Sequence, residues 1–165
     1  MRRVFFSTIF AGLLAASITL SAQSRPAIEG SIAGLELCPQ SFCGFALFVG
    51  GFQGELNSRE ATGSFVGAIT HEPLPDVFGS ADLTGGQWTI TANRRVLKGT
   101  VAGGQIYNID GTRFCIEMTM EVTDGGRGQL YFTGLLDHNP FPPTIGGIVR
   151  QEPVSCAVFL ASLPS

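Results

Sequence analysis

The stretch TRFCIEMTMEVT, Thr112 to Thr123, alternates apolar with mainly polar side chains. Successive side chains of a β-strand point to opposite faces of a sheet, so a period of two indicates a strand with one buried face. The predicted inner face carries Phe114, Ile116, Met118, Met120 and Val122, and the predicted outer face carries Arg113, Cys115, Glu117, Thr119 and Glu121.

The same alternation recurs elsewhere in the chain. Leu130, Phe132 and Leu136 share one face of residues 128–136, and Trp88 and Ile90 share one face of residues 87–92. Beyond the first 22 residues, no segment repeats apolar residues at helical spacing over three turns. We therefore predict a nearly all-β protein.

Turn residues separate the predicted strands. Glycine and aspartate tolerate the backbone conformations of tight hairpins, and they cluster at Gly103-Gly104, Asp110-Gly111 and Asp124-Gly125-Gly126. These turns predict a meander of five strands from Arg94 to Gln151. Three further strands are predicted from Ala27 to Thr70, joined by the Cys38–Cys43 loop and the Asn57–Glu60 turn. The total is about eight to ten antiparallel strands.

The predicted strands contain several glycines, which weaken a flat sheet but permit the sharp coiling that closes a barrel. They are Gly34, Gly50, Gly51, Gly54, Gly67, Gly99 and Gly134. Closure also removes exposed sheet edges. We favour a small antiparallel β-barrel, with a two-sheet β-sandwich as the alternative, and expect residues 23–165 to form one domain.

Composition excludes several classes of protein. With 165 residues, 44% of them hydrophobic and 14% charged, the chain is apolar enough to build a core and is not of disordered type. Acidic residues outnumber basic ones by 13 to 10, and Lys98 is the only lysine. A nucleic-acid partner is not expected, because phosphate recognition requires a basic face.

The first 22 residues have the layout of a secretory signal peptide. Arg2 and Arg3 precede the apolar run from Val4 to Leu20, and small residues follow, so we place cleavage after Ala22. The protein is therefore expected to be secreted or periplasmic, without stable membrane insertion. An outer-membrane barrel is disfavoured because Arg113, Glu117 and Glu121 on the predicted outer face would contact lipid.

Four cysteines, Cys38, Cys43, Cys115 and Cys156, follow the predicted cleavage site. An even number in an oxidising compartment indicates two disulfides. The short Cys38–Cys43 spacing favours a local bridge, which leaves Cys115 to Cys156; the other connectivities stay open. Because Cys115 falls on a wet face, we expect the tail Val154–Leu160 to cover it, either as a last strand or across the outside of the barrel. No C-x-x-C spacing of the redox or zinc kind occurs.

One sequence pattern occurs twice. FVGAITHEPLP, Phe65 to Pro75, and FTGLLDHNPFP, Phe132 to Pro142, share F-x-G-x-[IL]-x-H-x-P-[LF]-P at a constant offset of 67 residues, and they contain the only two histidines. This match predicts an internal duplication. The candidate repeats are Ile28–Gly79 and Val101–Gly146, with Ser80–Thr100 as an insertion or a linking hairpin.

The paired His-x-Pro segments supply the candidate functional residues. If both lie at one rim, His71, Glu72, Asp137 and His138 could combine for acid–base chemistry. If they lie at opposite ends, the two histidines do not meet, and the sequence does not decide between the two arrangements. The interpretation we prefer for the histidines is structural, with each one bonding to its own turn. No metal site and no cofactor are predicted.

Two functions are compatible with these patterns. We prefer a non-enzymatic binding or structural module, whose interior is either packed or holds one small apolar ligand, and which could also contact a protein partner. The alternative is a small barrel enzyme, an isomerase or a hydrolase, using His71 and His138 at the rim. Neither the G-x-S-x-G signature nor a phosphate-binding loop occurs in the chain.

Overall fold

The computed structural model describes residues 27–74 and 78–164. The predicted signal peptide, residues 1–22, lies outside these ranges, as does Pro75 at the end of the first His-x-Pro pattern. Within these two ranges the chain has eight strands and two helices.

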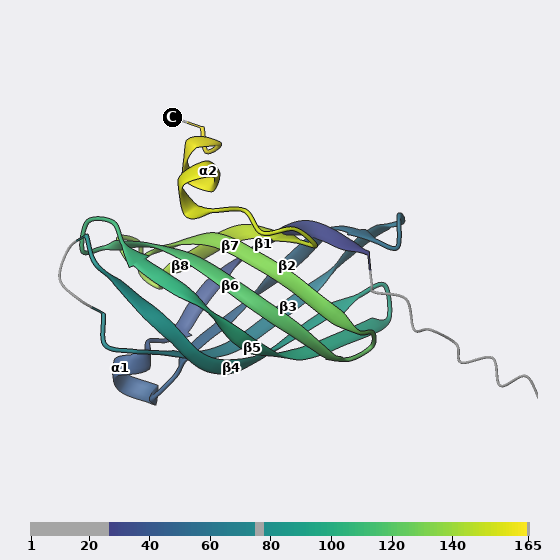
Figure 1. Ribbon diagram of the computed structural model, residues 1–165, viewed down its shortest axis with the longest axis horizontal. Coiled ribbons are helices and arrows are strands. Elements are labelled where there is room, and N and C mark those ends of the chain that lie inside the picture. Colours follow the sequence, from purple (N-terminus) through teal and green to yellow (C-terminus); the bar gives the residue numbers. More distant parts are fainter. Residues whose placement is uncertain (1–26, 75–77, 165) are drawn as a thin grey trace, which may run out of the picture.

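The chain forms one closed barrel of eight strands, each antiparallel to its neighbours (Figure 1). The strands are β1 (Ile28–Cys38), β2 (Ala46–Leu56), β3 (Glu60–His71), β4 (Ser80–Ala92), β5 (Arg95–Asn108), β6 (Arg113–Asp124), β7 (Gly128–Asp137) and β8 (Thr144–Arg150). The barrel closes where β1 pairs with β8, from Gly30 opposite Val149 to Leu35 opposite Thr144. The expected barrel is confirmed, and the two-sheet alternative is wrong.

The predicted meander from Arg94 to Gln151 has four strands, β5 to β8, and not five. The error lies at Gly103-Gly104, which is not a hairpin turn but the site of a register shift inside β5, between Val101 and Gly103. Both glycines have positive φ, as the turn prediction required. Positive φ also suits a β-bulge, so residue type alone did not distinguish a turn from a bend within one strand.

The inner faces match the alternation in the sequence. Phe114, Ile116, Met118, Met120 and Val122 of β6 are all buried. Trp88, Ile90, Leu130, Phe132 and Leu136, the inner residues predicted on the neighbouring stretches, are buried as well. One core inside the barrel therefore collects the apolar residues of every strand.

Aromatic side chains fill the barrel by lying across glycines. A Cβ atom added at Gly67 would lie 2.9 Å from the ring of Phe65, and one at Gly134 would lie 2.4 Å from the ring of Phe132. The F-x-G element of the repeated pattern thus has the same packing role on β3 and β7. Trp88 crosses to the next strand in the same way, 2.5 Å from a Cβ added at Gly99.

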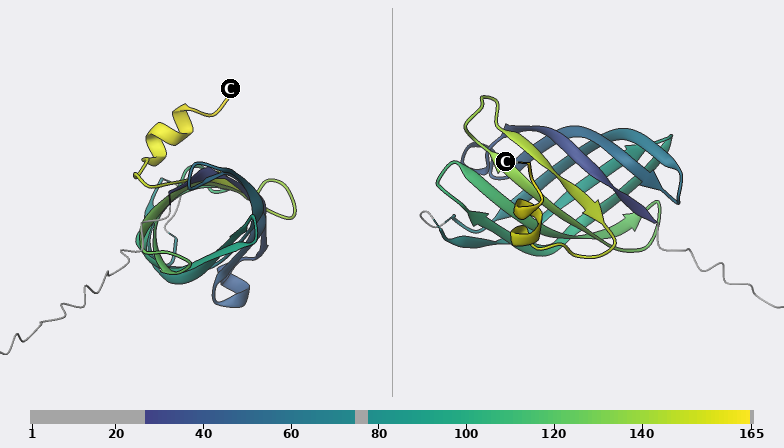
Figure 2. Two further views of the ribbon diagram at one scale, coloured as in Figure 1. Left: turned by 90° about the vertical axis from the view of Figure 1, so that its right-hand side faces the viewer. Right: turned by 90° about the horizontal axis from the view of Figure 1, so that it is seen from above.

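Two short helices lie outside the strands. Helix α1 (Gln40–Cys43) forms the β1–β2 connection, and the disulfide Cys38–Cys43 closes it. Helix α2 (Cys156–Ala161) lies against the outer wall and is joined to β6 by the disulfide Cys115–Cys156. Figure 2 shows the closed ring end-on with both helices outside it. The predicted cysteine pairing is confirmed.

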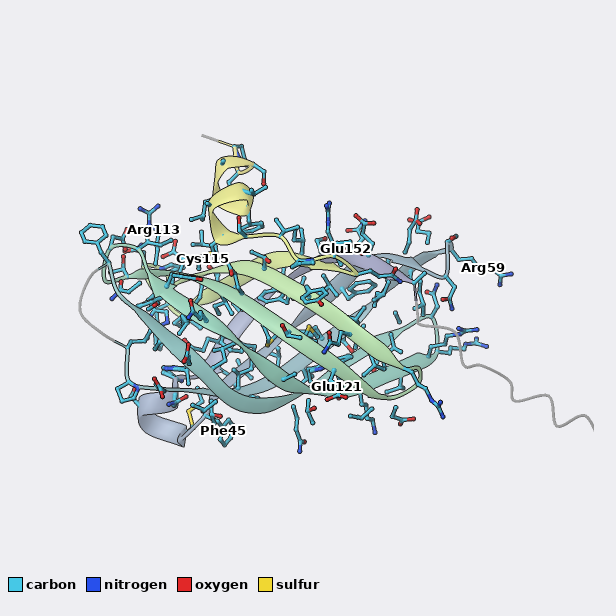
Figure 3. All side chains as sticks on the ribbon, in the orientation of Figure 1. Phe45, Arg59, Arg113, Cys115, Glu121 and Glu152 are labelled. Carbon is cyan, nitrogen blue, oxygen red and sulfur yellow. A yellow bond between two sulfur atoms is a disulfide. The ribbon has the colours of Figure 1, made fainter. Side chains whose placement is uncertain are left out.

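The tail covers Cys115 as expected, but as a helix and not as a strand. Cys115 is 1% exposed although it belongs to the outer face of β6, because Phe159 and its neighbours pack over it. Figure 3 shows Cys115 on the wall beneath α2. The Thr133 hydroxyl donates to the Val154 carbonyl at 2.6 Å, which fixes the segment leading into the helix.

The segment Ser80–Thr100, predicted as an insertion or linking hairpin, is a hairpin whose strands are full members of the barrel wall. The repeated His-x-Pro patterns fall at equivalent places, the ends of β3 and β7. Because strand direction alternates around the barrel, these ends lie at the same rim. The duplication itself stays a prediction.

No helix within 27–74 and 78–164 is long and apolar enough to span a membrane.

The packing of rings over glycines generates a stability prediction. The substitution Gly147→Ala would place a Cβ atom 2.5 Å from the Thr133 carbonyl oxygen and 2.6 Å from the Phe132 ring. We therefore expect the variant to lose about 1–3 kcal/mol of unfolding free energy. Chemical denaturation of the purified protein measures this loss.

The adjacent Gly146→Ala is the matched control. Its Cβ would approach nothing closer than 4.0 Å, so its unfolding free energy should stay within about 0.5 kcal/mol of the parent value. Equal losses in the two variants would contradict the packing argument.

Candidate functional site

A cavity of about 350 Å³ occupies one end of the barrel, at the rim where β1, β3, β5 and β7 end. We call it the rim cavity. Its walls are mainly apolar, and its lining includes Ala46, Phe48, Ile69, Leu83, Ile106, Phe114, Ile116 and Leu136. The large buried side chains Trp88, Phe65 and Phe132 do not line it. The cavity is thus a hollow at this rim of an otherwise side-chain-filled interior.

Figure 3 identifies the two ends of the barrel. Phe45 marks the rim that carries α1 and the cavity, and Arg59, in the β2–β3 turn, marks the opposite end. Residues Pro39, Gln40 and Ser41 line the cavity, so the loop closed by the Cys38–Cys43 disulfide forms part of its wall.

Glu36 is the buried charged residue of the cavity. Ile28, Ile32 and Glu36 are the buried positions of β1, so the carboxylate stands on the inner face of an otherwise apolar strand and is 4% exposed. Its Oε2 atom lies 2.9 Å from His138 Nε2 and makes no further hydrogen bond within the described chain. A buried carboxylate is costly unless it is paired, so this contact decides how Glu36 is tolerated.

His138 is held in place from three sides. Its backbone N–H donates to the Thr112 carbonyl at 2.8 Å, and its ring packs against Phe114 with 5.1 Å between ring centroids. Its Nε2 atom faces Glu36, while 35% of the side chain remains exposed. His138 therefore connects the buried carboxylate to solvent.

His71 lines the same cavity from the end of β3. The Gln40 side chain bonds to its backbone twice, donating to the His71 carbonyl at 2.7 Å and accepting from the His71 N–H at 2.8 Å. The ring Nδ1 lies 2.6 Å from the Glu72 carbonyl oxygen, so Nδ1 carries the proton and Nε2 is the atom left for other partners.

Burial raises the pKa of the Glu36 carboxyl above its ordinary value. The charges of His138 and His71 and the contact with His138 act in the opposite direction without cancelling the effect of burial. A carboxyl group with a raised pKa in an apolar pocket is typical of binding and acid–base sites.

The four residues singled out from the sequence are thus divided by the structure. His71 and His138 meet at one cavity. Glu72 is exposed and outside the cavity lining. Asp137 lies on the outer wall, where its carboxylate accepts from the backbone and side-chain amides of Asn139 at 2.8 and 2.7 Å.

The carboxylate partner of the histidines is Glu36, and sequence reasoning missed it. The signal was present, because the inward positions of β1 can be counted from Ile28 and Ile32 to Glu36. A charged residue on the inward face of a strand is the exception that points to a site. Reading only the neighbours of the histidines led to Asp137 and Glu72 instead.

Within the described ranges, no group of three or more His, Cys, Asp or Glu side chains is arranged to hold a metal ion. Comparisons with known protein families, with curated proteins and with solved structures found no match to this chain.

The raised pKa of Glu36 generates a pH-dependence prediction. Folding favours the protonated carboxyl, so its stabilising contribution is fully present below the ordinary carboxyl pKa of 4.5 and is lost as the pH rises through the higher pKa of the folded protein. We expect the difference in Tm, Glu36→Gln minus parent protein, to increase as the pH rises from 4 to about 8. Thermal unfolding of both proteins across that range measures the difference, and a constant or shrinking difference would contradict it.

Asp110→Asn is a control of opposite sign. Hydrogen bonds from Thr112 and Arg113 lower the pKa of Asp110. The contribution of its carboxylate to stability is therefore present above the ordinary carboxyl pKa and is lost as the pH falls. The parent protein should exceed this variant in Tm at neutral pH, with the advantage vanishing on acidification.

Proposed function

We propose that this protein is an exported binding module that holds one small, mainly apolar molecule in the rim cavity. The observation that carries the proposal is a mainly apolar cavity at one barrel end whose lining includes the titratable side chains Glu36, His71 and His138. Closed eight-stranded barrels have interiors wide enough to hold one small ligand.

The dimensions and lining of the cavity support this function. Its volume of about 350 Å³ lies at the small end of the range of about 300–1,000 Å³ for ligand sites. Such sites are mostly apolar, with a few polar groups that orient the ligand. The eight apolar wall residues and the Glu36–His138 pair at the rim correspond to that composition.

The polar cluster indicates the chemistry of the ligand's head group. Glu36 Oε2 accepts hydrogen bonds, and the ring nitrogen left to His71, Nε2, accepts in the neutral ring and donates in the protonated one. A hydroxyl group can donate to Glu36 Oε2 or to the neutral His71 ring, and a carbonyl group can accept from the protonated His71 ring. A second carboxylate would face the repulsion of Glu36. The expected ligand is therefore an alcohol or ketone with an apolar body.

Export fits the covalent structure of the protein. Two disulfides, Cys38–Cys43 and Cys115–Cys156, are compatible with an oxidising extracellular environment. The first of them also closes the loop that forms part of the cavity wall, so an oxidising compartment would maintain the binding site.

Ligand binding is tested with a neutral fluorescent apolar probe, N-phenyl-1-naphthylamine, and its displacement by medium-chain alcohols, ketones and alkanes. We expect the probe to bind, and alcohols and ketones to displace it better than alkanes of the same length. The variant Ala46→Leu extends a cavity-lining side chain and should weaken probe binding roughly tenfold or more.

Ala33→Leu is the matched control, because Ala33 is exposed on the outer face of β1 and should leave probe binding unchanged. Absence of probe binding, or equal binding by the Ala46→Leu variant and the parent protein, would overturn the proposed function.

A further inference from the structure

The Glu36–His138 pair combines three features that ligand binding alone does not require. The carboxylate is buried, its partner imidazole reaches solvent, and both line an apolar cavity. A proton taken up by Glu36 can therefore pass to His138 and leave the protein without opening the barrel. Carboxylates in apolar pockets act as general bases in this way.

We propose that Glu36, with His138 as its proton relay, catalyses proton transfer at the carbon next to the carbonyl group of an apolar ketone held in the rim cavity. This inference rests on the proposed function, because the ketone must first bind there.

The step is balanced in atoms and electrons. The Glu36 carboxylate takes a proton from the carbon adjacent to the carbonyl, and the electron pair of that C–H bond forms the C=C bond of an enolate. The carbonyl π electrons move to oxygen. If the abstracted proton leaves to solvent through His138 and a solvent proton is returned to the same carbon, that position has exchanged with solvent. Return of a proton to the γ carbon of a β,γ-unsaturated ketone, with re-formation of the carbonyl group, isomerises the double bond. The step consumes no other reactant.

His71 supplies a group for the enolate oxygen. Its Nδ1 is engaged with the Glu72 carbonyl, so Nε2 is the ring atom left for the enolate oxygen, to which it donates when the ring carries a second proton. Gln40 holds the backbone of His71 with two hydrogen bonds, which limits movement of the ring relative to the cavity. Donors held in place before reaction stabilise developing negative charge most effectively.

Hydrolysis is less well supported by the same cavity. Ser41 carries the only hydroxyl among the lining residues, and within the described chain it makes no hydrogen bond to Glu36, His71 or His138. A serine nucleophile would need such a base beside it. Proton transfer at carbon requires only the groups that are already in contact.

The test follows the exchange of α protons of a medium-chain 2-alkanone in D₂O by NMR, with purified protein and with the Glu36→Gln variant. We expect the parent protein to accelerate exchange and Glu36→Gln to lose about 10²-fold or more of that rate. Displacement of N-phenyl-1-naphthylamine by the same ketone confirms that both proteins bind it. Glu36→Gln retains the approximate size of the side chain while removing its basicity and its charge.

A second variant tests the relay. His138→Ala should slow exchange, and imidazole added to the solution should restore part of the rate, because the His138 site is open to solvent. Loss of a merely structural contact would not be rescued by a free base. Failure of imidazole to restore any rate would remove His138 from the proposal.

The outcomes separate the two proposals. A ketone that displaces the probe but exchanges no faster with the parent protein than with Glu36→Gln overturns the catalytic inference and leaves the binding function standing. If neither the probe nor the ketone binds, the proposed function fails, and the catalytic inference fails with it.

Discussion

The closure of the sheet between β1 and β8 is the constraint on which the rest of the molecule depends. Gly30–Leu35 pair with Thr144–Val149, and the ladder is extended by the bond from the Glu36 N–H to the Pro143 carbonyl at 2.9 Å. This seam leaves no open sheet edge and encloses a single interior. It also brings the end of β1 beside the β7–β8 loop, which is why Glu36 reaches His138.

Rings that lie across glycines fill part of the interior of the barrel. Phe65, Phe132 and Trp88 pack in this way on their own or neighbouring strands, and none of them lines the rim cavity. The cavity walls are formed by Phe48, Phe114 and smaller apolar residues near the rim. The rings that lie across glycines and the side chains that surround the cavity are thus different residues.

Much of the fold could be predicted because its signals are local. Alternation in β6 identified both faces of the strand, and Asp110-Gly111 and Asp124-Gly125-Gly126 marked real turns. Cysteine spacing led to the correct pairing. Prediction failed at Gly103-Gly104, because a bulge and a turn use the same backbone conformations and differ only in what the next residues pair with. It also failed to recognise the tail as a helix, since six residues are too few to show a helical period.

The sequence by itself determined the all-β architecture, the inward and outward faces of the alternating stretches, and the repeated pattern that carries the two histidines. It could also have marked Glu36 as an inward charge on β1. Only the tertiary structure decided that both histidines share one rim, that Glu36 and not Asp137 or Glu72 is their carboxylate, and that a cavity lies between them. The physical reason is that the direction of a side chain follows from the backbone of its own strand. The proximity of Glu36 to the histidines at the rim cavity depends instead on closure of the barrel between the first and last strands.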